Sequence, residues 1–284
     1  MKTQSAEQMG VCNWSLQAVN PQELAQKVTA LGLKKVQLGL VPHRDDPGLW
    51  DGVQDILAES GIAVVSGMFS TIGEDYTTPA TIQKTGGVVL DEFWDENLRL
   101  AESAADTAAA MGLAYVSVHA GFLPHDTADP DFDKLSARVV KLAEIFGAKG
   151  IAILLETGQE TARTLLAFLD EMKQRGVDNV AVNFDPANML LYDMDDPIEA
   201  LRLLAPHVRQ VHVKDAKRTT VKGQWGDEVV VGQGEVDWNA FVAILAEADF
   251  DGGYIFEREA GDNRVGDIKQ GIAALKAAMN QAGA

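Results

Sequence analysis

The chain has 284 residues, of which 46% are hydrophobic, and it carries a formal charge of −18 with a pI near 4.6. This length suits one domain with a single large core, over residues 1–284. The acidic balance argues against nucleic acid and anionic membrane surfaces as partners, because both are negatively charged. No apolar run approaches the roughly 20 residues that cross a bilayer, and the first residues do not show the pattern of a secretory signal. An internal disulfide is excluded because Cys12 is the single cysteine. We therefore expect a cytoplasmic protein.

Short β-rich apolar runs alternate with longer helical patterns from one end of the chain to the other. Proline stands near helix starts at Pro21 and Pro197, and glycine follows helix ends at Gly32 and Gly112. Strands are predicted at 10–15, 35–40, 62–69, 114–119, 151–156, 180–185, 208–213 and 253–258. Helices are predicted at 21–31, 50–60, 91–111, 132–147, 161–175, 197–204, 237–247 and 265–281.

Eight such β-α units predict a closed (β/α)8 TIM barrel, an α/β fold in a single domain. An open doubly wound sheet is the alternative, but the sequence holds neither a G-x-G-x-x-G turn nor a G-x-x-x-x-G-K-[ST] loop for phosphate binding. Three connections after strands are long, at 70–90, 120–131 and 214–236. Because such loops lie over the active face of a barrel, they are candidate lids.

Four consecutive predicted strands end in residues that can bind a metal ion. Glu156 ends IAILLE, Asp185 ends VAVNFD, His212 lies near the end of VRQVHV, and Glu257 lies near the end of GYIFER. Neighbouring strand ends lie about 5 Å apart, so three buried carboxylates would repel one another unless a cation lay among them. One acid at a strand end could instead serve an ion pair or a helix cap. Four on successive strands favour a metal site.

A site of three carboxylates and one imidazole suits an octahedral divalent cation better than a tetrahedral structural zinc. We expect one such ion, with Mn²⁺ favoured and Mg²⁺, Co²⁺ or Zn²⁺ as the other candidates. Four protein ligands leave about two coordination positions for a substrate with adjacent carbonyl and hydroxyl oxygens. The substrate predicted from this chemistry is a small carbohydrate.

Several polar residues near the same rim are candidate substrate ligands. His119 ends VSVH and could hold a substrate hydroxyl, act as a further ligand, or simply be a core histidine. Lys214, Asp215 and Arg218 follow His212 and could hold substrate oxygens or form a solvated charge run. Asn188 follows Asp185 by three residues and could bind a hydroxyl or shape the turn.

Other residues of the rim have weaker claims. Glu259 alternates with Glu257, which predicts that it points away from the ion, toward an arginine. Gln159 and Glu160 could do no more than begin a helix. The aromatic residues that could line a sugar ring, or belong to the core, are Trp14, Phe69, Phe122 and Trp225.

The motifs LLETGQE, NFDPANM, HVKDA, GQGEVDW and FERE together resemble the xylose isomerase-like TIM-barrel superfamily of sugar isomerases and epimerases. The resemblance covers nearly the whole chain. It implies that Glu156, Asp185, His212 and Glu257 bind the metal, and that the two glutamates are the acid/base pair. It also implies a substrate contact for Arg218, six residues after the metal-binding histidine.

Two positions depart from the ketose 3-epimerases of that superfamily. Asn188 stands where those enzymes carry a histidine, and Ala162 stands where they carry a second glutamate. The HVKD motif instead resembles the dehydratase-like members.

The predicted function is a divalent-metal-dependent isomerase or epimerase of a small sugar or keto-sugar, working by proton transfer through a metal-stabilised enediolate. The alternative is a lyase or dehydratase that acts on a keto-inositol or 3-keto-glycoside with the same site. A metal-dependent endonuclease on a similar barrel would need more histidines and a basic surface, and a non-catalytic sugar-binding barrel would not need a metal. The sequence leaves homo-oligomerisation open.

Overall fold

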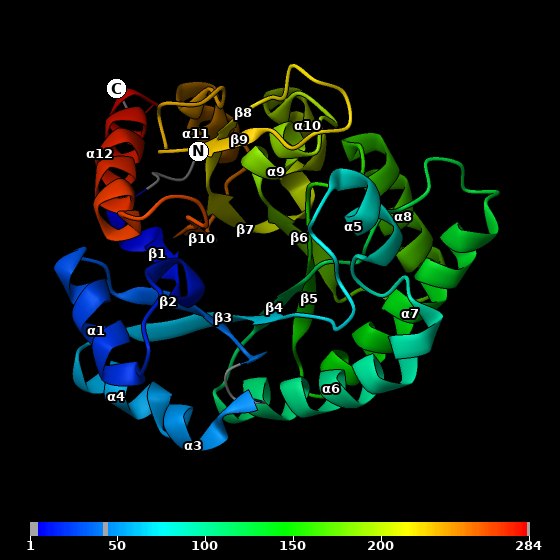
Figure 1. Cartoon of the computed structure of the whole chain (residues 1–284), viewed down its shortest axis with the longest axis horizontal. Helices are drawn as coiled ribbons and strands as arrows, with labels where there is room; N and C mark the ends of the chain where they lie inside the picture. Colours follow the sequence, from blue (N-terminus) through cyan, green and yellow to red (C-terminus); the bar gives the residue numbers. More distant parts are fainter. Residues whose placement is uncertain (1–4, 42–44, 283–284) are drawn as a thin grey trace.

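The computed structural model describes residues 5–41 and 45–282. Eight parallel strands close into one barrel (Figure 1). Around the barrel the order is β1, β2, β3, β4, β5, β6, β7 and β10, and β10 pairs with β1. The predicted (β/α)8 TIM barrel in a single domain is therefore confirmed. The strands are β1 Met9–Cys12, β2 Lys35–Gly39, β3 Ala63–Phe69, β4 Tyr115–Val118, β5 Ala152–Glu156, β6 Val180–Phe184, β7 Val208–Val213 and β10 Gly253–Phe256.

Helices surround the barrel and follow the predicted pattern closely (Figure 1). Gly32 and Gly112 have positive φ just after helix ends, the backbone conformation that glycine adopts without strain. Within the described residues, no helix is long and apolar enough to cross a membrane. The surrounding helices are α1 Pro21–Ala30, α3 Pro47–Trp50, α4 Val53–Glu59, α6 Asp91–Ala110, α7 Pro130–Gly147, α8 Ala162–Gln174, α10 Pro197–Leu204, α11 Trp238–Glu247 and α12 Arg264–Ala282. Residues 1–4, part of the N-terminal segment in which no secretory signal is predicted, lie outside the described residues.

Several short elements were not predicted, and most of them lie at the carboxyl ends of the strands. The predicted strand 10–15 ends at Cys12, because the chain turns into a 3-10 helix, Asn13–Leu16, and the Asn13 side chain accepts a hydrogen bond from Gly39 N at 2.7 Å. The loop 70–90 contains α5 Pro79–Thr85, and α9 Pro186–Leu191 follows β6. The loop 214–236 contains an antiparallel pair, β8 Asp215–Lys217 and β9 Asp227–Val229. Two further 3-10 turns are Ala6–Gln8 and Ala205–His207.

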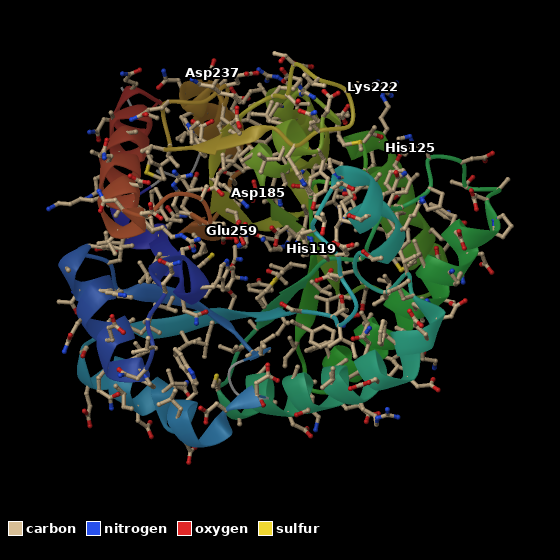
Figure 2. All side chains as sticks on the ribbon, in the orientation of Figure 1. His119, His125, Asp185, Lys222, Asp237 and Glu259 are labelled. Atoms are coloured by element: carbon tan, nitrogen blue, oxygen red, sulfur yellow. The ribbon has the colours of Figure 1, made fainter. Side chains whose placement is uncertain are left out.

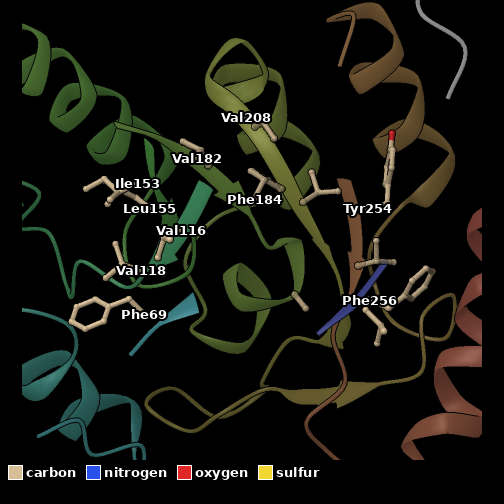
Figure 3. Close-up of a cluster of buried hydrophobic side chains, with 14 of the residues drawn as sticks. Phe69, Val116, Val118, Ile153, Leu155, Val182, Phe184, Val208, Tyr254 and Phe256 are labelled. Atoms are coloured by element: carbon tan, nitrogen blue, oxygen red, sulfur yellow. The ribbon is translucent and has the colours of Figure 1, made fainter. Parts of the chain in front are cut away.

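The strands alternate between an apolar outer face and a polar lumen. Val116, Val118, Val182 and Phe184 belong to the buried hydrophobic cluster of Figure 3. Ser117 and Asn183, which lie between them in sequence, are buried and hydrogen-bonded to other lumen side chains. The strand runs are therefore less uniformly apolar than a parallel sheet suggests, and the polar lumen supports the site at its mouth.

Candidate metal centre and active site

Four side chains from neighbouring strands meet at the carboxyl end of the barrel. Glu156 ends β5, Asp185 follows β6, His212 lies in β7, and Glu257 follows β10; all four are buried. One ligand atom from each residue lies within 4.8 Å of all the others. From His212 Nδ1 the distances are 3.2 Å to Glu156 Oε1, 3.5 Å to Glu257 Oε2 and 3.8 Å to Asp185 Oδ2. The structure thus brings together the four residues that the sequence singled out, and Figure 2 shows Asp185 near the centre of the view.

The two carboxylate oxygens of Asp185 have different surroundings: one caps a helix, and the other faces the site. It is the N-cap of α9, where Oδ1 accepts from Ala187 N at 2.8 Å and from Asn188 N at 3.0 Å. Oδ2 is buried without a hydrogen-bond partner. Such an orphaned acceptor among carboxylates is costly unless a cation is near it, so the residue fits a metal ligand.

Gln37 fixes the orientation of the His212 ring. Its amide nitrogen donates to Ser117 Oγ at 2.9 Å and Gly67 O at 3.2 Å, which leaves its oxygen as the acceptor for His212 Nε2 at 2.7 Å. The hydrogen of His212 Nε2 is therefore committed to Gln37, and Nδ1 faces the carboxylates without a hydrogen-bond partner. A neutral imidazole held in this way presents its lone pair to a cation.

The surroundings favour the protonated forms of both His212 and Asp185. Burial lowers the pKa of His212, but the nearby Glu156 carboxylate, Cys12 and Glu257 outweigh it and hold that pKa well above its usual value. Burial also raises the pKa of Asp185 well above the ordinary range, and the neighbouring glutamates raise it further against the effect of Lys214. A divalent cation would displace these protons, so the donor set fits such an ion.

Each glutamate of the site has partners that hold both of its oxygens. Glu257 Oε1 accepts from Trp14 Nε1 at 2.7 Å, and its Oε2 accepts from Lys214 Nζ at 2.9 Å. Glu156 Oε1 accepts from Asn188 Nδ2 at 3.1 Å. Glu156 Oε2 accepts from Asn183 Nδ2 at 3.3 Å, and His119 Nε2 lies 4.0 Å from it.

Nearby positive charges lower the pKa of both carboxyl groups. Burial raises the pKa of Glu257, but Lys214 and His212 outweigh it and hold that pKa well below the usual value. Burial acts in the same way on Glu156, and His212 and His119 lower its pKa below the usual value. Two carboxyl groups with lowered pKa values therefore face the His212 ring.

Lys214 is a buried ammonium group in the middle of this cluster. Besides Glu257 it contacts Glu259 Oε2 at 2.7 Å and Asn188 Oδ1 at 3.3 Å, and it lies 3.9 Å from Asp185 Oδ2. Burial lowers its pKa, but the surrounding carboxylates, Glu257 first, raise it well above the usual value. The predicted arginine partner of Glu259 is therefore wrong, because Lys214 takes that place.

A cavity of about 870 Å³ opens at the candidate metal centre, where Glu156 and Glu257 line it. His119, Asn188 and Lys214, three of the predicted substrate ligands, line it. The fourth, Arg218, is not among the lining residues; its guanidinium donates to Asp193 Oδ1 at 2.8 Å and to Asp195 O at 2.5 Å.

The weaker candidates divide between the cavity and the fold. Trp14 and Trp225 line the cavity, whereas Phe69 packs on Phe146 in the core and Phe122 stacks with His125 beside a smaller hollow. Asp215 is a buried anchor that accepts from the backbone of Gly232, Gly234 and Val236 and from Trp238 Nε1. Gln159 and Glu160 are buried and lie outside the cavity lining.

The sequence reasoning missed the lumen residues beneath the metal centre. Ser66 Oγ donates to Gln210 Oε1 at 2.6 Å, Gln210 donates to Asn183 at 3.3 Å, and Asn183 donates to Glu156. The signal that could have found them is a polar side chain, such as Gln37, inside an apolar strand.

Solved structures share this architecture over nearly its full length. A xylose isomerase domain protein from Planctomyces limnophilus matches with a TM-score of 0.84 and 29% identity over 97% of both chains. A xylose isomerase-like TIM barrel protein from Mycobacterium smegmatis, in complex with magnesium, matches with a TM-score of 0.72 and 18% identity over 97% of this chain and 98% of that one. A 3-keto-D-glucoside 4-epimerase from E. coli matches with a TM-score of 0.69 and 16% identity over 95% and 99%. The last two likenesses concern the fold alone.

Matches to curated proteins are shorter. The Escherichia coli protein YihM is 29% identical over 108 residues, which is 38% of this chain and 32% of that protein. The inosose dehydratase of Clostridium tetani is 21% identical over 160 residues, which is 52% of this chain and 54% of that protein. The chain thus spans about a third to a half of the length of these relatives.

A family comparison covers most of the chain. The family described as xylose isomerase-like TIM barrel matches residues 25–278, a stretch that includes all four proposed metal ligands and seven of the eight barrel strands. The chain belongs to the xylose isomerase-like TIM barrel family.

Proposed function

We propose that the protein is a divalent-metal-dependent isomerase or epimerase of a small, unphosphorylated sugar or keto-sugar. The observation that carries the proposal is the pair of buried atoms without hydrogen-bond partners, Asp185 Oδ2 and His212 Nδ1, which face two ionised glutamates. Glu156, Asp185, His212 and Glu257 would hold one ion. Its identity is proposed as Mn²⁺ from the oxygen-rich donor set, with Mg²⁺, which is present in the Mycobacterium smegmatis structure, as the next candidate.

The proposed chemistry is proton transfer at a carbon next to a carbonyl group. When bound, the ion would polarise that carbonyl and stabilise the negative charge that develops on the substrate. Glu257, held by Trp14 and Lys214, would take or return the proton on one side. Glu156, held by Asn188 and Asn183, would do so on the other side. Return to the same carbon gives epimerisation, and return to the neighbouring carbon gives aldose–ketose isomerisation.

Lys214 and His119 would orient the substrate oxygens. The Lys214 ammonium reaches the cavity beside Glu257, and His119 borders it beside Glu156. Both would donate hydrogen bonds to hydroxyl or carbonyl oxygens at the reacting end of the sugar. Arg218 has no part in this proposal, because Asp193 and the Asp195 carbonyl occupy its guanidinium.

A dehydratase is the second candidate, and Lys214 favours it. An ammonium beside the base Glu257 could protonate a departing hydroxyl group after the α-proton is removed, so that water leaves and a double bond remains. The sequence match to an inosose dehydratase supports the same alternative.

Solvent exchange separates the two candidates. The Mn²⁺-loaded protein would be incubated in D₂O with a panel of ketoses, keto-inositols and 3-keto-hexosides and followed by NMR. Deuterium incorporation with an epimer or isomer as product supports the proposal, whereas loss of water to an unsaturated ketone favours the dehydratase. Full activity of Glu257→Gln would contradict the two-glutamate scheme.

A further inference from the structure

The cavity is larger than a single sugar ring needs. Its volume of about 870 Å³ lies near the top of the range of roughly 300–1,000 Å³ in which proteins enclose drug-sized ligands. One hexose bound at the metal centre is much smaller than such a ligand. Part of the cavity therefore remains beyond the reacting ring.

Helix α9 leads from the metal centre into this outer part. The helix begins after Asp185, presents Asn188 to Glu156, and ends at Leu191; the next residue, Tyr192, lines the cavity. Because a helix rises 1.5 Å per residue, Tyr192 lies roughly 10 Å along the helix from Asp185.

The outer part of the cavity has an aromatic wall. Tyr192 and Trp225 form an edge-to-face pair with ring centroids 4.8 Å apart, and Tyr76, 46% exposed, lines the same cavity from the β3–α5 loop. The backbone next to Trp225 is held against α9. Gly226 N donates to Leu191 O at 3.1 Å. A Cβ atom at Gly226 would lie 2.6 Å from Lys217 O of β8 and 3.1 Å from Leu191 Cα of α9, so glycine allows the chain to pass this close to both elements.

The charges on the wall select against an anionic ligand. Glu74, Asp227, Glu228 and Glu259 all line the cavity. Among the described lining residues the cations are Lys214, which is engaged by Glu257 and Glu259, and His119 when protonated. A phosphate or carboxylate in the outer part would meet carboxylates without a free cation.

We propose that Tyr76, Tyr192 and Trp225 form a second subsite, which binds an uncharged ring joined to the keto-sugar, so that the substrate is a glycoside. This inference rests on the proposed function, since it places the keto-sugar at the metal centre. The faces of aromatic rings pack against the C–H groups of a sugar or against an aromatic ring, and the phenol and indole groups keep polar edges toward water. A glycoside cannot open its ring at the anomeric carbon. The subsite therefore points to epimerisation beside a ring ketone rather than to aldose–ketose isomerisation.

Two glycosides of one 3-keto-hexose test the subsite, the phenyl and the methyl glycoside. Calorimetric Kd values would be measured on the Mn²⁺-loaded protein, and kcat/KM would be followed in parallel. We expect the phenyl glycoside to bind about tenfold more tightly than the methyl glycoside. In Trp225→Ala and Tyr192→Ala this ratio falls to about one, whereas in Phe122→Ala, an aromatic residue outside this cavity, it stays near ten. The ratio is independent of the fraction of folded protein, so a partly unfolded variant does not imitate the result.

The outcomes separate the subsite from the proposed function. Equal affinity for the two glycosides, no binding of either, or a ratio that Trp225→Ala leaves intact would overturn the subsite. A phenyl preference that Trp225→Ala abolishes, without deuterium exchange in any substrate, would support the subsite and contradict the proposed reaction. Turnover of free keto-hexoses with no phenyl preference would support the reaction alone.

Discussion

Gln37 Oε1 lies 2.7 Å from His212 Nε2, across the lumen of the barrel, although β2 and β7 are not neighbours. The same glutamine is fixed by Ser117 and Gly67, so its oxygen has no other orientation that keeps these bonds. The contact therefore selects the tautomer of His212 that can bind a metal through Nδ1.

We expect Gln37→Met to lower Mn²⁺ affinity by about 10- to 100-fold, as for other residues that orient metal ligands. Gln37→Glu keeps an oxygen at this position and should lie closer to the wild type. Calorimetry gives the affinities, and the ¹⁵N shifts of His212 report its tautomer. Equal affinity of Gln37→Met and wild type would show that the ring needs no such support.

Asp185→Asn should separate metal binding from folding. The asparagine oxygen can still accept from Ala187 and Asn188 at the start of α9, but the anionic ligand is lost. Because the pKa of Asp185 is raised in the fold, its ionisation costs stability as pH rises above about 4. We therefore expect a metal-free Tm at pH 8 equal to or above that of the wild type, and Mn²⁺ affinity lower by about 100-fold or more. A Tm that falls while affinity is kept would contradict this division.

Lys214→Met should affect turnover more than metal binding. The substitution removes a positive charge that lies 3.9 Å from Asp185 Oδ2, so Mn²⁺ should bind at least as tightly as in the wild type. Loss of the ammonium beside Glu257 should lower the rate of deuterium exchange by about 100-fold. Parallel calorimetry and exchange rates check both effects, and weaker Mn²⁺ binding would show that Lys214 supports the ion instead.

The raised pKa of Glu160 predicts a loss of stability between about pH 4.5 and pH 8. Burial, with a smaller effect of Asp195, raises its pKa from 4.5 to about 8. A raised acid pKa means that the fold favours the protonated form, so stability is full below about pH 4.5 and falls as pH rises toward 8, by about 5 kcal/mol at most. Glu160→Gln should match the wild type near pH 5 and exceed its Tm at pH 9. Glu144→Gln, on the exposed face of α7, is the control that should leave the pH dependence unchanged.

The residues along the strands were sufficient to predict the barrel and the four residues that gather at the candidate metal centre. The hydrophobic periodicity and the proline at the helix start predicted α10 at its observed bounds, 197–204. The carboxyl ends of four consecutive strands bring Glu156, Asp185, His212 and Glu257 together. In a parallel barrel all strand ends of one kind share one rim, so order along the chain already implies proximity in space. The start of α9 was also readable, because Asp185 and Pro186 are a cap and a first-turn proline, yet this helix was missed.

What only the tertiary structure decided is how each side chain is held. The contact of Gln37 with His212 and the relay from Ser66 through Gln210 and Asn183 to Glu156 join strands that are distant in sequence. They depend on how far each strand is shifted when the barrel closes, and the register shifts at Val36/Gln37 and Val182/Asn183 alter which side chains meet. Local sequence does not encode that stagger. The engagement of Arg218 by Asp193 and of Lys214 by Glu259 follows the same principle, because competing charges choose partners by their positions in space.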